Sequence, residues 1–251
     1  MLHPLILYIV SRTKKHFDML RFWILVLPLF LTQFAKAQSE EVLTSRRMSM
    51  VRTQISNRGI SHKETLEAMR NVKRHEFVPS SLRSVAYDDR PLPIGFGQTI
   101  SQPYIVAYMT ELAKPSKGMR ALEIGAGSGY QAAILAEIVD SVFTIEIVPE
   151  LGRSSHRTLK QQGYTNVKVK IADGYHGWTE KGPFDIILVT AAAEHIPPPL
   201  IEQLKDGGIM VIPVGSPFLV QQLMLVEKKR GKVTTRSLIP VRFVPFTRAA
   251  D

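Results

Sequence analysis

Two hydrophobic periods alternate along the second half of the chain. Short apolar runs of strand length are separated by longer stretches whose apolar residues recur at helical spacing. The pattern predicts helices over 130–139, 150–162 and 200–204. It predicts strands over 121–124, 142–147, 167–171, 185–189 and 208–213, and a terminal pair over 223–227 and 233–244. The run 185–189 is almost wholly apolar, as expected of a strand covered on both faces.

This alternation predicts an α/β fold with a mostly parallel, doubly wound sheet. Consecutive parallel strands are joined by right-handed crossovers, and the crossover helices cover both faces of the sheet. Ligands of such sheets bind at the carboxyl ends of the strands. Residues that directly follow a predicted strand are therefore the first candidates for a binding site.

The pattern before residue 112 is helical and then irregular. Short helices are predicted over 53–58, 63–71 and 80–86, with Ser61 as an N-cap and Glu64 completing a capping box. Residues 88–103 contain three Pro and two Gly, which forbid a continuous helix. We expect a long ordered loop or a loop with edge strands, followed by a helix that begins at Pro103 or Tyr104 and ends at 112. Loops of this length in compact domains are usually functional when they are ordered.

The first 37 residues differ from the rest of the chain. Basic residues up to Arg21 precede an apolar run over 22–31, and Ala35-Lys36-Ala37 has the small-x-small pattern of a signal peptidase site. The segment resembles a secretory signal, because a run of about ten residues is shorter than the roughly 20 that a spanning helix needs. An uncleaved anchor, or an upstream extension with the real start at Met48 or Met50, would give the same pattern.

Composition adds limits rather than a function. The chain has 251 residues with 45% hydrophobic and 22% charged, enough for one sizeable core, and no low-complexity linker divides it. The absence of Cys excludes disulfide scaffolds, thiolate zinc sites and cysteine nucleophiles. The formal charge of +10 is scattered, and its densest run, Lys228 to Arg230, lies beside Gly231 in a predicted hairpin turn. A solvated turn explains that run better than a phosphate-binding patch.

The strongest chemical signal follows the first predicted strand of the sheet. Gly125, Gly127 and Gly129 lie in a strand-to-helix turn, where a ligand can approach the backbone and the helix N-terminus. The dinucleotide fingerprint requires Gly at its sixth position, where this chain has Tyr130. The spacing therefore favours a nucleoside or its amino-acid tail over a pyrophosphate, although a tight turn without a ligand is the simpler alternative.

Two acidic residues follow the next two strands. Glu146 ends the second strand, where a carboxylate can accept hydrogen bonds from both hydroxyls of a ribose. Asp173 follows the third strand and could accept from an adenine amino group. Either acid alone could be a surface cap, but the two beside the glycine loop fit an adenosine and suit a cationic sulfonium better than phosphates.

Four segments resemble the protein-L-isoaspartate O-methyltransferase family. They are Gly-Gln-Thr-Ile-Ser-Gln-Pro at 97–103, Leu-Glu-Ile-Gly-Ala-Gly-Ser-Gly-Tyr at 122–130, Val-Thr-Ala-Ala-Ala at 189–193 and Arg-Phe-Val-Pro-Phe-Thr at 242–247. Many methyltransferases share the glycine loop, whereas the 97–103 segment is specific to this family. The resemblance implies a Rossmann-like class I S-adenosylmethionine-dependent fold in one domain over 48–248. Residues 48–118 would form a substrate-side extension and 119–248 the cofactor-binding sheet.

The same resemblance implies the reaction and its residues. The family transfers the methyl group of S-adenosylmethionine, without a metal, to the free α-carboxyl of L-isoaspartyl residues in damaged proteins. That carboxylate is already ionised at neutral pH, so catalysis should depend on proximity, orientation and exclusion of water. Ser101 would orient the acceptor, a role compatible with capping the helix that follows, and Gln98 and Thr99 would line the substrate cleft. The implied cofactor-binding residues are Gln102, Tyr104, Gly125, Gly127, Gly129, Glu146, Asp173, Gly174 and Thr247.

Three other classes of protein fit less well. A nicotinamide oxidoreductase explains Glu146 but neither Tyr130 nor Asp173, and an inactive binding module does not explain Ser101. A nucleic-acid methyltransferase would need a basic cleft or a different fourth strand end. His195 has no second ligand at metal spacing and is interpreted as structural. We expect a monomer without nucleic-acid or stable membrane partners, cytoplasmic by family resemblance and cofactor supply, or periplasmic or envelope-anchored if residues 1–37 act as a signal.

Overall fold

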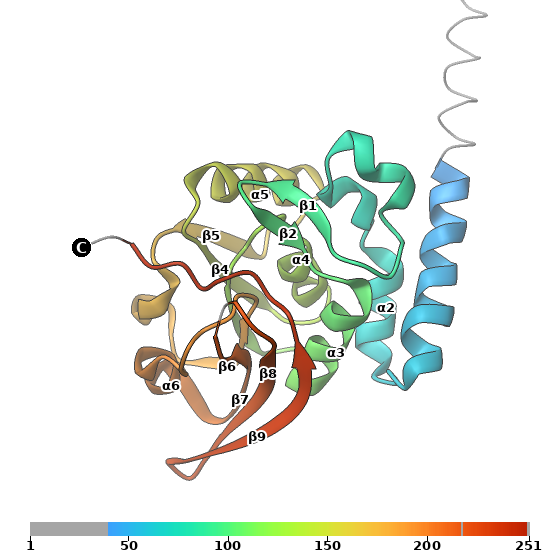
Figure 1. Ribbon diagram of the computed structural model, residues 1–251. Coiled ribbons are helices and arrows are strands. Elements are labelled where there is room, and N and C mark those ends of the chain that lie inside the picture. Colours follow the sequence, from blue (N-terminus) through green and yellow to red (C-terminus); the bar gives the residue numbers. More distant parts are fainter. Residues whose placement is uncertain (1–39, 217, 250–251) are drawn as a thin grey trace, which may run out of the picture. The chain divides into compact units, whose positions relative to one another are not determined.

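The structure is a computed structural model that describes residues 40–216 and 218–249 (Figure 1). The chain divides into two compact units, residues 1–46 and 47–251. In the first unit residues 40–46 are helical, and the signal-like segment 1–37 lies outside the described residues. In the described ranges, no helix is both long and apolar enough to cross a membrane. All further description concerns the second unit.

A seven-stranded sheet forms the centre of this unit, in the order β5-β4-β3-β6-β7-β8-β9. Five neighbouring strands, β5 to β7 in that order, run parallel, and β8 and β9 add an antiparallel hairpin. The strands are β3 (Arg120–Ile124), β4 (Ser141–Glu146), β5 (Val167–Ile171), β6 (Phe184–Val189), β7 (Leu204–Val214), β8 (Gln221–Lys229) and β9 (Lys232–Val241). The predicted mostly parallel sheet is confirmed.

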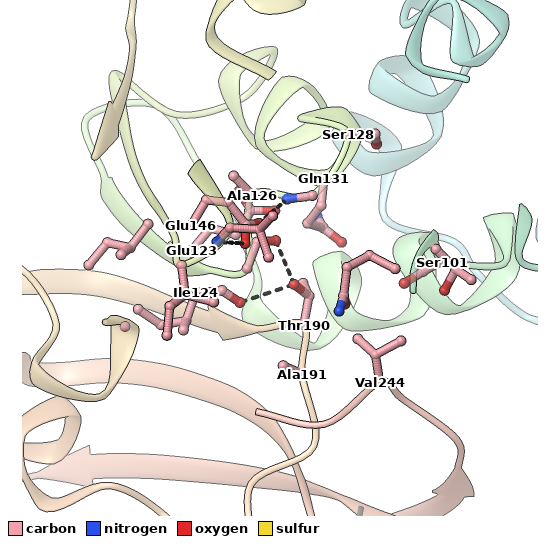
Figure 2. Close-up of a pocket in the computed structure, with 18 of the residues that line it drawn as sticks. Ser101, Glu123, Ile124, Ala126, Ser128, Gln131, Glu146, Thr190, Ala191 and Val244 are labelled. Atoms are coloured by element: carbon pink, nitrogen blue, oxygen red, sulfur yellow. Dashed lines mark hydrogen bonds between the residues drawn. The ribbon is translucent and has the colours of Figure 1, made fainter. Parts of the chain in front are cut away.

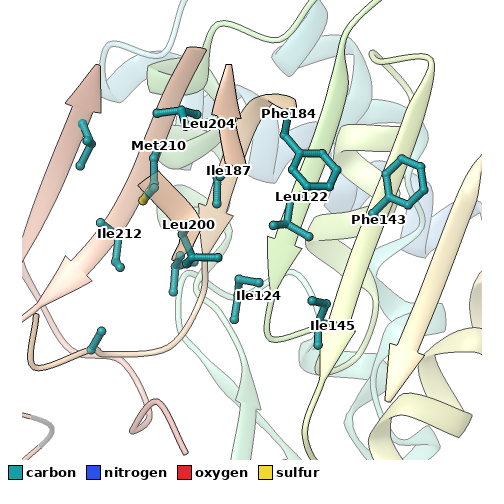
Figure 3. Packing of buried hydrophobic residues seen from close by; sticks show 13 residues of the cluster. Leu122, Ile124, Phe143, Ile145, Phe184, Ile187, Leu200, Leu204, Met210 and Ile212 are labelled. Carbon is teal, nitrogen blue, oxygen red and sulfur yellow. The ribbon is translucent and has the colours of Figure 1, made fainter. Parts of the chain in front are cut away.

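Helices cover both faces of the sheet. α3 (Pro103–Ala113), α4 (Tyr130–Ala136) and α5 (Pro149–Gln161) pack on its strands, and α6 (Pro198–Gln203) packs against β7. Side chains at alternate strand positions share a face. One face is formed by residues such as Leu122, Ile145 and Met210, which pack with Leu200 of α6 (Figure 3). The opposite face of β3 and β4 contains Glu123 and Thr144, directly across from each other.

The N-terminal part of the unit is helical up to a small hairpin. A π-helical turn (Val51–Ile55), 3₁₀ turns (Ser56–Arg58, Arg74–Phe77, Ser80–Val85) and α2 (Lys63–Asn71) precede β1 (Leu92–Gly95) and β2 (Gln98–Ile100). β1 and β2 pair antiparallel, so the predicted loop with edge strands is the form observed. In Figure 1 this hairpin lies over the end of the sheet near α4 and α5.

Three local predictions need correction. The N-cap of α2 is His62, whose Nδ1 accepts from the Thr65 amide at 3.3 Å, because the carboxylate of Glu111 accepts from the amides of both Ser61 and His62. Strand β7 begins at Leu204, four residues before the predicted start at 208. Lys228 and Lys229 both belong to β8, and Lys228 donates to the Ile201 and Leu204 carbonyls, so only Arg230 and Gly231 form the turn.

Candidate active site

The glycine loop turns sharply between β3 and α4. Gly125 has φ +97°, and a Cβ at this position would lie 2.5 Å from Oγ1 of Thr190. Thr190 follows β6, and its hydroxyl donates to the carbonyls of Ile124 and Gly125. A side chain is therefore excluded at Gly125 by the neighbouring strand end as well as by the backbone conformation.

Glu146 connects the glycine loop to the end of β4. Its Oε2 accepts from the Gly127 amide at 2.7 Å, and its Oε1 accepts from the Val148 amide at 2.9 Å. The side chain is only 5% exposed. Each carboxylate oxygen can accept a second hydrogen bond, so Glu146 both fixes the loop and can bind a ligand hydroxyl.

A cavity opens at these strand ends (Figure 2). Its walls are formed by the ends of β2, β3, β4 and β6, by the glycine loop and by a C-terminal segment, residues 244–247. The space that a water-sized sphere can occupy is about 80 Å³. Pockets for small ligands usually measure about 300–1,000 Å³. The enclosed part of the cavity is therefore smaller than a usual small-ligand pocket.

Ser101 lies at the junction of β2 and α3, on the wall of the cavity together with Gln98 and Thr99. α3 begins at Pro103 with Gln102 as the capping residue, and no side chain caps it. The expected capping role of Ser101 is therefore not observed. No described residue forms a hydrogen bond with its hydroxyl, which leaves that group available to a ligand.

The predicted site residues separate into two groups. The cavity is lined by eight of them: Gln98, Thr99, Ser101, Gly125, Gly127, Glu146, Gly174 and Thr247. Gly129, Gln102, Tyr104 and Asp173 lie outside this lining. Gly129 instead allows close packing of α4 on α5, because a Cβ there would lie 3.1 Å from Leu159.

Three side chains outside the lining have partners of their own. The Gln102 amide donates to the carbonyl of Asp89 at 3.1 Å, and the Tyr104 ring lies under the guanidinium of Arg58 at 3.5 Å. Asp173 accepts from the Tyr175 amide and from Arg248. Burial works to raise the pKa of Asp173, but the hydrogen bonds from Arg248, Tyr175 and Ala249 outweigh it, so this pKa lies below its ordinary value.

Glu123 is a cavity residue that the sequence analysis did not single out. Its side chain is fully buried on β3, its Oε2 accepts from the Thr144 hydroxyl at 2.5 Å, and its Oε1 has no partner. Burial raises the pKa of Glu123 to about 8, against the opposing effect of the Thr144 hydrogen bond. The signal that could have revealed it is an ionisable residue inside a strand covered on both faces.

The described residues contain no group of three or more His, Asp or Glu side chains that could hold a metal ion. His195 is exposed and contacts the ring of Tyr175 edge-on at 6.3 Å. The chemistry of the cavity therefore depends on hydroxyl, carboxylate and backbone groups.

A comparison with protein families matches residues 45–251 to the protein-L-isoaspartate(D-aspartate) O-methyltransferases. The chain belongs to this family. Curated relatives include protein-L-isoaspartate O-methyltransferases from Opitutus terrae and Syntrophobacter fumaroxidans. The first is 57% identical over 85% of this chain and 92% of the relative, and the second is 62% identical over 72% of this chain and 74% of the relative.

Solved structures agree with the family. One protein-L-isoaspartate O-methyltransferase superposes with a TM-score of 0.72 at 29% identity; the match covers 79% of this chain and 65% of that chain. A Plasmodium falciparum protein assigned to the same family, solved with S-adenosyl-L-homocysteine, gives 0.71 at 26% identity over 81% of this chain and 99% of that chain. The family and its α/β S-adenosylmethionine-dependent fold are as the sequence motifs indicated.

Proposed function

We propose that this protein transfers the methyl group of S-adenosylmethionine to the free α-carboxyl of L-isoaspartyl residues, the first step in repairing damaged proteins. The single observation that supports this most directly is the placement of Ser101. Its unpaired hydroxyl lines the same cavity as the glycine loop and Glu146. An acceptor carboxylate oriented by Ser101 would therefore lie beside the cofactor site.

The cavity residues fit S-adenosylmethionine, which supplies an electrophilic methyl group when bound. Gly125 and Gly127 allow a close backbone approach, and Glu146 can accept from ribose hydroxyls. Glu123 also lines the cavity, and its unpartnered Oε1 could form a hydrogen bond with a polar group of the ligand. Thr247 and Gly174 would complete the walls. Asp173 would accept from the adenine amino group only if Arg248 shares its carboxylate.

The residues around the acceptor would act by position. Gln98 and Thr99 would hold the isoaspartyl backbone while the Ser101 hydroxyl donates to one oxygen of the acceptor carboxylate. The other oxygen would then be free to attack the methyl carbon in line with the sulfur–methyl bond, whose electron pair would stay on sulfur as S-adenosylhomocysteine leaves. Because the carboxylate is already ionised at neutral pH, no base is needed, and exclusion of water protects the methyl donor.

The decisive experiment supplies labelled S-adenosylmethionine with an isoaspartyl peptide or its normal aspartyl twin. We expect a base-labile methyl ester on the isoaspartyl peptide and essentially none on the twin. Equal methylation of both would contradict the proposal. Ser101→Ala should lower turnover more than cofactor affinity, because the hydroxyl is assigned to the transition state; loss of cofactor affinity with unchanged turnover at saturation would place Ser101 in the cofactor site.

We further propose that residues 48–248 act as one methyltransferase domain in a monomer, with damaged proteins and peptides as its substrates. A cytoplasmic location fits the supply of S-adenosylmethionine, which is made there. Fractionation of the host with N-terminal sequencing tests this, and a mature N-terminus at Gln38 in the periplasmic fraction would overturn it.

A further inference from the structure

A second cavity adjoins the first beside Ser101. It measures about 460 Å³ and is lined by residues from the ends of β2 and β9, the start of α3 and the segment after β9. Thr99, Ser101, Thr190 and Val244 line both cavities. A peptide whose reacting carboxylate lies at Ser101 therefore has room for a neighbouring side chain in the second cavity.

Arg242 gives this cavity its charge. It is the charged residue among those that line the cavity, the remainder being apolar or neutral polar. Arg242 directly follows β9 and is exposed. In the described part of the chain, no ion pair or hydrogen bond satisfies its guanidinium. Its five N–H groups are therefore available to a carboxylate from outside.

The acids of the neighbouring elements are engaged elsewhere. The carboxylate of Glu111 on α3 accepts from the amides of Ser61 and His62. Asp89, whose carbonyl accepts from the Gln102 side chain on the cavity wall, contacts Arg58 at 2.7 Å. The residues that line the second cavity include no acid, so Arg242 gives it positive charge.

We propose that Arg242 is a specificity-determining residue that binds an acidic side chain within about two positions of the isoaspartyl residue, so that acidic sequences are the preferred substrates. This inference rests on the proposed function, because the acidic side chain is placed relative to an isoaspartyl carboxylate at Ser101. Its binding site is the second cavity, separate from the glycine loop and Glu146.

The test uses the full chain and isoaspartyl peptides that differ at one position. Gln, Glu or Lys is placed one or two residues from the isoaspartyl residue, on either side, and kcat and KM are measured at low and high salt. We expect KM to be about fivefold lower for the preferred Glu peptide than for its Lys counterpart, as for a partly exposed charge pair, with the difference shrinking at high salt. kcat should vary little.

Charge reversal at two positions distinguishes a specific contact with Arg242 from an effect of the overall charge of the protein. Arg242→Glu should invert the preference, so that the Lys peptide has the lower KM, and Arg242→Gln should remove the preference. Lys232→Glu is the matched control, because Lys232 lies at the exposed start of β9, outside both cavities, and the charge change is identical. It should keep the preference for Glu. Melting temperatures establish that each variant is folded.

Three results would overturn the inference. The first is equal KM values for the Glu and Lys peptides with the unsubstituted enzyme. The second is the same inversion of the preference in Lys232→Glu. The third is an equal rise in KM for all peptides in Arg242→Gln. The last result would mean that Arg242 binds the reacting carboxylate itself. The Gln peptide keeps the two proposals separate, since its methylation reports the proposed activity whether or not a charge preference exists.

Discussion

The guanidinium Nε of Arg248 lies 2.8 Å from Oδ2 of Asp173, and the guanidinium carbon lies 3.7 Å from the centre of the Tyr175 ring. Upstream, the Ala192 amide donates to the carbonyl of Val244 and the Phe246 amide donates to the carbonyl of Ala192. These contacts hold residues 244–249 across the carboxyl ends of the strands, where residues 244–247 form one wall of the narrow cavity.

Releasing this wall should make the cavity easier to enter. Because Arg248 ties the segment that walls the cavity to Asp173, Arg248→Ala should raise both the association and the dissociation rate constants for S-adenosylmethionine. Stopped-flow fluorescence or competition measures both rates. Arg230→Ala, at the exposed turn between β8 and β9, is the control and should leave them unchanged. Unchanged rates in Arg248→Ala would mean that another wall moves.

Glu146→Gln should weaken cofactor binding. An amide nitrogen cannot accept a hydrogen bond, so the amide of Gly127 or of Val148 loses its acceptor and the ribose loses a carboxylate. The expected cost is about 1–3 kcal/mol, or roughly five- to 150-fold in Kd by isothermal titration calorimetry. Glu180→Gln, exposed on a 3₁₀ turn, should have no effect. The assignment of Glu146 fails if the two variants bind alike.

Gly125→Ala should destabilise the protein more than Gly163→Ala does. Both glycines have positive φ, +97° and +85°, so both substitutions share a backbone cost. A Cβ at Gly163 meets nothing within 4 Å, whereas at Gly125 it would contact Thr190. Overpacking of this kind costs about 1–3 kcal/mol, which urea unfolding of the two variants measures as a difference. Equal free energies of unfolding would show that Thr190 moves aside freely.

Glu123 should make stability fall as the pH rises. Its pKa is about 8 in the folded chain, against an ordinary value near 4.5, so the folded state binds the proton more tightly than the unfolded state. The stabilisation is complete below about pH 4.5 and is lost between about pH 4.5 and 8 as the carboxyl ionises in the unfolded state. The free energy of unfolding should fall by a few kcal/mol in total across this range.

The Glu123→Gln variant should unfold with a flatter pH dependence over the same range, as measured by urea denaturation at several pH values. The control is Glu227→Gln, on the exposed side of β8. It should reproduce the slope of the unsubstituted protein. An unaltered slope in Glu123→Gln would mean that another group titrates there.

The sheet was predictable because its strands have simple signals. The predicted strand over 167–171 has the bounds of β5, β3 and β6 each begin one residue earlier than predicted, and β4 both begins and ends one residue earlier. Apolar runs flanked by glycines and acids mark these strands wherever they lie in space. The start of β7 was missed because two glycines, Gly207 and Gly208, interrupt its pattern.

Contacts between distant residues account for what the sequence could not predict. His62 replaces Ser61 as a cap because of Glu111, some 50 residues away, and Arg248 reaches Asp173 over 75 residues. The sequence analysis did not single out Glu123, because its pKa is raised by burial in the folded protein and not by any neighbour in sequence. Local patterns indicated where the site lies; the pairing of its charges depends on tertiary packing.

The outer strands of the sheet have a further consequence for the protein in concentrated solution. β5 and β9 are the two edges, and an unpaired edge is where strands of separate molecules join and aggregate. β5 contains Lys168 and Lys170, while β9 contains Lys232, Arg236 and Pro240. Positive charge on both edges repels a second copy, and Pro240 cannot donate to an added strand.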